Sequence, residues 1–251
     1  MEKTYQRAEL KWRRNHIAEV VGSHMFIYGG IDEDFRYLSD MWVLDLYNFI
    51  WMKVTPKTGK IVTPTLAFHC STMAYGIERR EHPNFKFSSF SEIPNSRQYR
   101  KLKGEGLYIF GGMDEEKNMK NDIRYLKLGK KQIEWVAPKT EGNGPCARIS
   151  ATMNYLEDLH VLVITGGCDK DRKLFYNDIY ILDLEKYKWT KINVYNDLPI
   201  RRAEHCSILL DKKLIVFGGI NSKCYVGSEL YVVNFGKIEY FMLIYFFYLL
   251  F

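Results

Sequence analysis

The 251-residue sequence lacks the features of a secreted or disulfide-stabilised protein. Its N-terminal segment, MEKTYQRAELKWRRNH, carries charges throughout and has no apolar stretch of signal-peptide length. The five cysteines form an odd set without a CxxC pair, and no Asn-x-Ser/Thr glycosylation site occurs. We therefore expect reduced thiols and a cytoplasmic protein.

Neither sign of charge dominates the sequence. There are 36 Lys and Arg against 30 Asp and Glu, and the resulting net charge of +6 is spread along the chain, which argues against a nucleic-acid-binding surface. The phosphate-binding patterns GxxxxGK[ST] and GxGxxG are absent, and no Ser/His/Asp or Cys/His arrangement stands out. We therefore expect no cofactor and no catalytic residues.

What the sequence does contain is an internal repeat. Four apolar runs end in a glycine pair: MFIYGG, LYIFGG, VLVITGG and LIVFGG. The glycines of these pairs are Gly29 and Gly30, Gly111 and Gly112, Gly166 and Gly167, and Gly218 and Gly219. The first glycines lie 82, 55 and 52 residues apart, so the first interval carries an insertion, which falls at residues 76–104.

Three further sets of equivalent positions in the four copies, here called columns, follow the same period. An acidic residue lies 10 or 11 positions after the second glycine of each pair and opens a second apolar run: Asp40, Asp122, Asp178 and Glu229. A Trp follows in three copies, as Trp51, Trp135 and Trp189, and the spacing predicts Tyr240 in this column of the fourth. Upstream, an Arg-x-x-His pattern is complete at Arg13/His16 and Arg202/His205, and partial at Leu66/His69 and Arg148/Ala151.

Each unit contains four short runs rich in β-branched and aromatic residues, with turn-forming residues between them, and therefore predicts a four-stranded antiparallel meander. The middle strands are apolar on both faces, so each sheet must stack on a neighbour. Radial stacking of such sheets gives a β-propeller, with the Trp between adjacent blades.

The apolar run ending in Gly-Gly, the acidic column and the later Trp, repeated near every 50 residues, resemble the kelch family of β-propellers. We expect an all-β, kelch-type propeller of four blades in one domain, residues 11–251. The blades are predicted at 11–56, 64–138, 145–195 and 199–245.

Two features of this propeller stay open at the level of sequence. Four units use the whole chain, so they form either an incomplete ring or a closed four-bladed ring. The apolar tail, residues 241–251, is either the end of the fourth strand of blade four or a membrane anchor. Its uncharged run from Tyr240 contains 12 residues, against about 20 for a bilayer span, so we expect the strand.

Two paired motifs invite a metal hypothesis. His69-Cys70 and His205-Cys206 combine imidazole and thiol, which are zinc ligands. Both pairs occupy the same column of the repeat in different blades, so we expect structural residues and no metal site.

The resemblance implies a non-catalytic protein-interaction module or scaffold, since nothing in the sequence marks chemistry. The alternative is an enzyme or small-molecule binder that uses the central channel. The insertion 76–104 is either a solvated loop or a partner or phosphorylation site. We expect partner contacts on charged loops that follow the second strands: Asp32, Glu33, Asp34, Arg36, Asp114, Glu115, Glu116, Lys117, Asp169, Lys170, Asp171 and Arg172.

Overall fold

The computed structural model describes residues 10–56, 63–75, 103–128, 133–192, 200–225, 228–235 and 245–248. Its strands are β1 (Ile17–Val21), β2 (His24–Tyr28), β3 (Met41–Asp45), β4 (Ile50–Val54), β5 (Cys70–Ala74), β6 (Gly106–Phe110), β7 (Ile123–Leu128), β8 (Ile133–Val136) and β9 (Thr152–Leu156). They continue with β10 (Val161–Thr165), β11 (Ile179–Asp183), β12 (Lys188–Ile192), β13 (Cys206–Leu210), β14 (Lys213–Phe217), β15 (Ile220–Asn221), β16 (Cys224–Tyr225), β17 (Leu230–Asn234) and β18 (Tyr245–Tyr248). A single 3-10 turn, η2 (Glu157–Leu159), is the helical element of the described residues.

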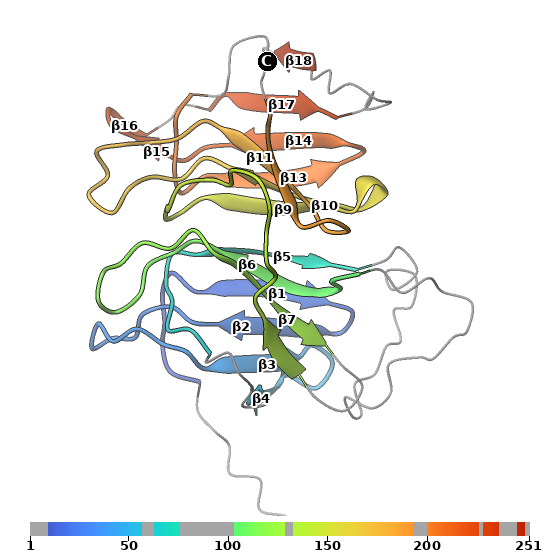
Figure 1. Ribbon diagram of the computed structural model, residues 1–251. Helices are drawn as coiled ribbons and strands as arrows, with labels where there is room; N and C mark the ends of the chain where they lie inside the picture. The colour runs from blue at the N-terminus through green and yellow to red at the C-terminus, as the bar shows by residue number, and fades with distance from the viewer. Residues whose placement is uncertain are drawn as a thin grey trace, which may run out of the picture.

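Sixteen of these strands form four antiparallel four-stranded sheets, which confirms the predicted propeller class, and β15 and β16 pair as a separate two-stranded sheet. Blade 1 has the order β1-β2-β3-β4, blade 2 β5-β6-β7-β8, blade 3 β9-β10-β11-β12 and blade 4 β13-β14-β17-β18. In Figure 1, blade 1 lies at the bottom and blade 4 at the top, with the other two blades between them. The sheets therefore follow the chain order around a four-bladed β-propeller.

The last strand of blade 4 differs from the prediction in register. In the first three blades the column of Trp51, Trp135 and Trp189 lies opposite a leucine of the third strand. In blade 4 the residue in this position is Phe246, opposite Val233, and Tyr240 lies outside the described residues. Spacing misplaced the column because the connection from Asn234 to Tyr245 is longer than the corresponding turns in the other blades. The tail thus supplies a strand, as expected. No helix in the described part of the chain has the length and apolar character needed to cross a bilayer.

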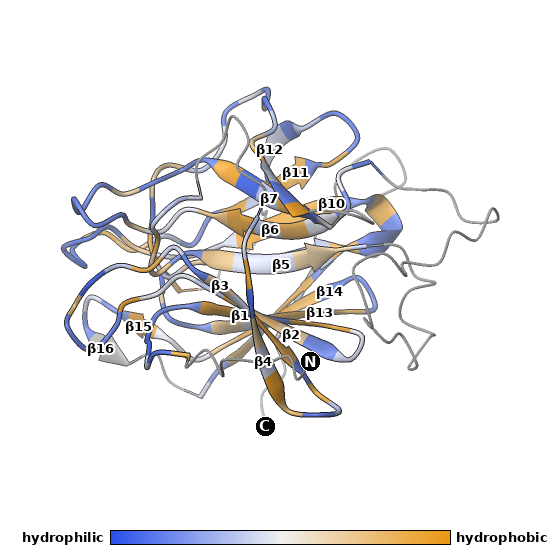
Figure 2. Ribbon diagram, turned by 90° about the horizontal axis from the view of Figure 1, so that it is seen from below, coloured by the Kyte–Doolittle hydropathy of each residue, from blue (hydrophilic) through white to orange (hydrophobic). Residues whose placement is uncertain are grey.

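Apolar side chains of adjacent blades form the core. One cluster joins blades 1 and 2, a second joins blades 2 and 3, and a third joins blades 3 and 4. Figure 2 shows the apolar strands and the more polar loops that connect them. Two tryptophans pack onto the preceding blade: the Trp135 ring lies 5.1 Å from that of Tyr28, and the Trp189 ring 5.8 Å from that of Phe110. The Trp column therefore holds neighbouring blades together.

Within the part of the chain that the structure describes, the propeller is open between blade 4 and blade 1. Among the described residues, none of the three clusters between the sheets joins blade 4 to blade 1, and the two blades share only a cluster of loop residues at one end, which contains Ile31 of blade 1 and Ala203 of blade 4. Phe217, which corresponds to Tyr28 and Phe110, is 49% exposed, whereas those two rings are buried. The described residues therefore form the incomplete ring of the two predicted possibilities.

In the first three blades, the first glycine of the pair makes a close approach to the following blade. Gly166 has φ +66°, and a Cβ there would lie 2.5 Å from His205 Cε1 and 2.8 Å from the Arg202 carbonyl oxygen. Gly29 and Gly111 meet the following blade in the same way. Gly218 has the same conformation, φ +67°, but no atom lies within 4 Å of its Cβ position.

This difference makes a matched pair of substitutions. Both Gly166→Ala and Gly218→Ala place a Cβ in left-handed backbone, which costs about 1–2 kcal/mol. Only Gly166→Ala also displaces His205 and the backbone of Arg202, so we expect it to lose about 1–2 kcal/mol more. Urea unfolding at low protein concentration measures the free energy of unfolding of both variants. Equal losses would show that His205 and the backbone of Arg202 move away from the new Cβ at no energetic cost.

Candidate protein-interaction rim

The loops that follow the second strands gather with the connections between blades at one end of the propeller. Antiparallel bridges join Arg14 to Ile31, Ala67 to Met113, and Ile149 to Cys168. Under them lies an apolar cluster that comprises Ile31, Tyr37, Ala67, Met113, Ile149, Cys168, Phe175 and Ala203. These loops and connections, here called the loop rim, share one face as predicted from the meander. The insertion lies outside the described residues over 76–102.

Three of the loops use the same turn. Phe35, Lys117 and Arg172 occupy left-handed backbone at equivalent positions, and their N–H groups donate to the carbonyl oxygens of Asp32, Asp114 and Asp169. The carboxylates of these aspartates accept further backbone N–H groups, for example from Arg36, Asn118 and Lys173. The first acid of each loop therefore holds the turn in shape.

This local role changes the set of residues that a partner can reach. Asp32 is buried at 4% exposure, and hydrogen bonding to Arg36 and to backbone N–H groups lowers its pKa although burial acts in the opposite direction. Asp114 and Asp169 are half-buried. The other nine predicted residues are exposed: Glu33, Asp34, Arg36, Glu115, Glu116, Lys117, Lys170, Asp171 and Arg172.

Several basic side chains of the rim are engaged inside the protein. Arg36 pairs with Asp32 at 3.0 Å and also contacts Asp34. Lys117 reaches from blade 2 to blade 1, where its Nζ donates to the Tyr37 hydroxyl at 3.1 Å and lies 4.4 Å from the ring centroid. Arg172 pairs with Glu204 of blade 4. Lys117 and Arg172 thus link neighbouring blades, whereas Arg36 stays within its own loop.

A groove of about 330 Å³ opens beside the loop of blade 2. It is lined by Thr63, Pro64, Thr65, Leu66, Asp114, Glu115, Glu116, Lys120, Asp122 and Arg124. Lys120 pairs with Asp114 at 2.5 Å and Arg124 with Asp122 at 2.6 Å. Glu115 and Glu116 have no ion pair with another described residue, so the groove carries an excess of negative charge.

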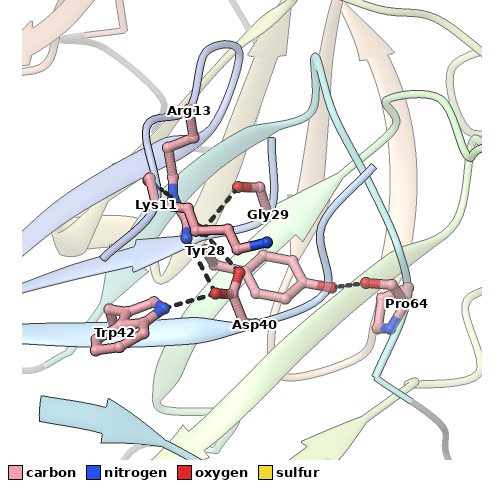
Figure 3. Close-up of polar contacts among 7 residues, drawn as sticks. All are labelled: Lys11, Arg13, Tyr28, Gly29, Asp40, Trp42 and Pro64. Carbon is pink, nitrogen blue, oxygen red and sulfur yellow. Dashed lines mark hydrogen bonds and ion pairs between the residues drawn. The ribbon is translucent and has the colours of Figure 1, made fainter. Parts of the chain in front are cut away.

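The groove is positioned by the linker between blades 1 and 2. Residues 63–66 lie along blade 1, where the Tyr28 hydroxyl donates to the Pro64 carbonyl oxygen (Figure 3). The Gly30 N–H donates to the Leu66 carbonyl at 2.8 Å, and the Leu66 N–H to that of Leu38. Sequence reasoning missed this linker because its residues belong to no repeat column apart from Leu66.

The Arg and acid columns form a clamp within a blade, which spacing alone did not reveal. Arg13 donates to both Asp40 carboxylate oxygens, at 2.7 and 3.0 Å, and to the Gly29 carbonyl at 3.2 Å (Figure 3). Trp42 Nε1 donates to the same carboxylate. Burial would raise the pKa of Asp40, but these hydrogen bonds hold it below its ordinary value.

The clamp recurs in blade 3 and is altered in the other two. Arg148 donates to both Asp178 oxygens, at 2.5 and 3.0 Å. In blade 2, where Leu66 replaces the arginine, Asp122 pairs with Arg124 instead. In blade 4 Arg202 donates to the Gly218 carbonyl, whereas Glu229 accepts from the Tyr231 hydroxyl. The sequence signal that could have revealed the clamp lies in blade 2. There the column has Leu66 in place of the arginine, and Arg124 follows Asp122 as a new partner.

The histidine of each His-Cys pair contacts the preceding blade. His69 lies edge-on to Tyr28 of the preceding blade, with ring centroids 5.4 Å apart, and Cys70 Sγ lies against the Phe110 carbonyl at 3.5 Å. His205 donates to or accepts from Thr152 Oγ1 at 2.9 Å, while Cys206 is exposed. Within the described residues, no three side chains of metal-ligand type converge. The histidine and the cysteine of each pair therefore lie in different surroundings, although they are neighbours in the sequence.

Buried histidines make stability depend on pH. Burial lowers the pKa of His69 to about 3 and that of His205 to about 4, from 6.5. Below pH 6.5 the unfolded chain takes up protons that the folded chain does not, so the free energy of unfolding falls as the pH falls toward these folded values. Between pH 7.5 and 5.5 we expect each histidine to contribute a loss on the order of 1 kcal/mol.

The substitution His205→Gln tests this dependence because a glutamine can keep the hydrogen bond to Thr152 without titrating. Urea unfolding at both pH values should show a smaller difference for the variant than for the unchanged protein. An identical pH dependence would mean that His205 does not stay neutral in the folded protein.

Comparisons with known proteins agree with the repeat and the blades. Residues 85–243 match the KLHDC2/KLHL20/DRC7 Kelch-repeats domain. The chain is 27% identical over 243 residues to acyl-CoA-binding domain-containing protein 5 of Arabidopsis thaliana, an alignment that covers 85% of this chain and 37% of the relative. It is 26% identical over 218 residues to host cell factor of Drosophila melanogaster, covering 80% of this chain and 12% of that protein. A 97-residue segment is 41% identical to the flagellar outer-arm dynein alpha chain of Chlamydomonas reinhardtii, covering 36% of this chain and 2% of that protein.

Proposed function

We propose that this chain, which belongs to the kelch-repeat family of β-propellers, is a non-catalytic protein-interaction module whose loop rim binds a protein partner with basic side chains. The observation that carries the proposal is the groove beside the blade 2 loop, where Glu115 and Glu116 are exposed without an ion pair to another described residue. A scaffold role and a cytoplasmic location are parts of the same proposal.

Rigidity of the rim supports this function. The three loops rest on a shared apolar cluster, and their aspartates hold each turn by backbone hydrogen bonds. Lys117 and Arg172 tie neighbouring loops together. A partner would therefore meet a preformed surface, which lowers the entropic cost of binding.

Charge sets the kind of partner. Lys120 and Arg124 are engaged by Asp114 and Asp122, so the glutamates supply the uncompensated field of the groove. Such a field mainly steers and orients a partner of opposite charge, and salt screens it. A segment of a protein with Lys or Arg side chains fits these conditions.

The test reverses charge without disturbing the turn. Asp114 must stay, because its carboxylate holds the turn through Asn118 and Lys120, so the variant is Glu115→Lys with Glu116→Lys. We expect affinity capture of partners from a cell extract to fall about tenfold, and the remaining capture to depend less on salt.

The matched control makes the same change in charge away from the rim. Glu134→Lys with Glu185→Lys alters exposed side chains near the β7–β8 and β11–β12 turns. This control should capture partners like the unchanged protein. Equal capture by the rim variant would contradict the proposal, and a protein bound through residues 79–103 would move the site to the insertion.

A further inference from the structure

Each of the three blade-to-blade contacts is built from the same parts, here called the joint. The earlier blade supplies its glycine pair, and the N–H of the second glycine donates to a carbonyl of the later blade: Gly30 to Leu66, Gly112 to Arg148, and Gly167 to Arg202, at 2.8–2.9 Å. The later blade supplies the segment that carries the Arg-x-x-His column. The joint thus has two different halves, one on each face of a blade.

A chain of backbone hydrogen bonds runs through the joints near the centre of the propeller. The Phe68 N–H donates to the Asn15 carbonyl at 3.0 Å, the Ser150 N–H to that of Phe68 at 2.9 Å, and the Glu204 N–H to that of Ser150 at 3.1 Å. All four residues have φ between 55° and 59°. The chain begins at the N–H of Asn15 and ends at the carbonyl of Glu204, and the described residues provide neither with a backbone partner.

Blade 4 presents the first half of a joint without the second. Gly218 has open space where Gly29, Gly111 and Gly166 meet the next blade. On the same face Phe217 is 49% exposed and Ile208 59% exposed. At the equivalent positions of blades 1 and 2, the rings of Tyr28 and Phe110 pack on the following Trp.

Blade 1 presents the second half without the first. Val20 is 54% exposed, whereas Met73 at the same position of blade 2 is buried. Trp51 is half-buried, whereas Trp135 and Trp189 are buried beneath the preceding blade.

We propose that two copies of this chain associate head to tail, with blade 1 of one copy placed on blade 4 of the other in a fourth joint. Phe217 would pack on Trp51 of the second copy, as Phe110 packs on Trp189 within the chain. The Glu204 carbonyl would accept the Asn15 N–H of the second copy. The occupant is a second copy because the two open faces of one chain are the two halves of a contact that this chain forms three times.

Head-to-tail contact leaves one open half at each end of a pair, so association continues beyond two copies unless a ring closes. We therefore expect sedimentation equilibrium of the full chain to show a mass that rises with concentration between about 1 and 200 µM. A monomer throughout this range would overturn the proposal and leave the open faces to blades of another protein.

Two single variants distinguish this geometry from a symmetric contact. Phe217→Asp blocks the blade 4 face and Val20→Asp the blade 1 face, and both side chains are already exposed in the single chain. Each variant alone should associate at least about tenfold more weakly. Their mixture should form a 1:1 pair that grows no further, because the intact blade 1 face of one variant meets the intact blade 4 face of the other.

Phe35→Asp, at a 71% exposed ring on the loop rim, is the matched control and should associate like the unchanged chain. Complementation in the mixture also shows that both variants are folded. If the mixture fails to pair while circular dichroism shows folded variants, the contact is not head to tail and the proposal is wrong. The rim variant Glu115→Lys/Glu116→Lys should not affect this association, so the two proposals are tested separately.

Discussion

Replacing Arg148 with alanine should destabilise the protein by about 3–5 kcal/mol, because the substitution leaves the Asp178 carboxylate without its partner. The Arg148 side chain is fully buried, and that of Asp178 is 16% exposed. Burial would lower the pKa of Arg148, but the bidentate contact with Asp178 raises it, so the guanidinium stays charged. A loss of this size is a large part of the 5–15 kcal/mol that stabilises an ordinary domain.

Two further variants identify the cause of this loss. Lys127→Ala removes a 46% exposed lysine that pairs with the 41% exposed side chain of Glu134, and it should cost no more than about 1 kcal/mol. The double variant Arg148→Met/Asp178→Leu removes both charges and should be more stable than Arg148→Ala. Denaturant unfolding measures the stability of all three variants. A double variant as unstable as Arg148→Ala would show that lost packing, rather than the unpaired Asp178 carboxylate, causes most of the loss.

Replacing Trp189 with alanine should cost about 3–5 kcal/mol. The indole is 6% exposed, belongs to the cluster between blades 2 and 3, and contacts the Phe110 ring. Gly144 lies so close that a Cβ there would be 2.9 Å from the indole nitrogen. The surroundings therefore cannot close easily over the space that the ring leaves.

The control for this prediction is Trp12→Ala. Trp12 is 85% exposed, and its removal should change the free energy of unfolding by less than about 0.5 kcal/mol. Thermal melting followed by circular dichroism compares the two variants with the unchanged protein. A melting curve of Trp189→Ala that matches that of Trp12→Ala would mean that the blade contact of Trp189 contributes little.

Much of the fold could be predicted from the repeat. Gly29, Gly111 and Gly166 repeat because each blade needs left-handed backbone at the same close contact, and that need is expressed in one residue type. Trp135 and Trp189 repeat because each blade buries a large ring against its neighbour. Strand positions follow from short apolar runs, which alternate with turn residues within a few residues of one another.

Predictions that depended on loop length or on the role of a single side chain were less accurate. Tyr240 was expected opposite the third strand of blade 4, but the longer connection brings Phe246 there. Asp32 was grouped with the exposed charges, but its carboxylate turns inward to hold the loop. The groove at Glu115 was not foreseen because four of its ten lining residues come from the linker 63–66, which only the packed blades bring near.

By itself, the sequence determined the number of blades, their order and the residues that repeat, because these depend on local period and residue chemistry. Only the tertiary structure decided that Arg13 clamps Asp40, that each joint has two unlike halves, and that Gly218 and Trp51 are left on open faces. These facts concern contacts between residues 27 or more positions apart, such as Arg13 and Asp40, and between whole blades. A periodic pattern states which residues are equivalent, but it does not state which neighbour each one meets or where the series of neighbours stops.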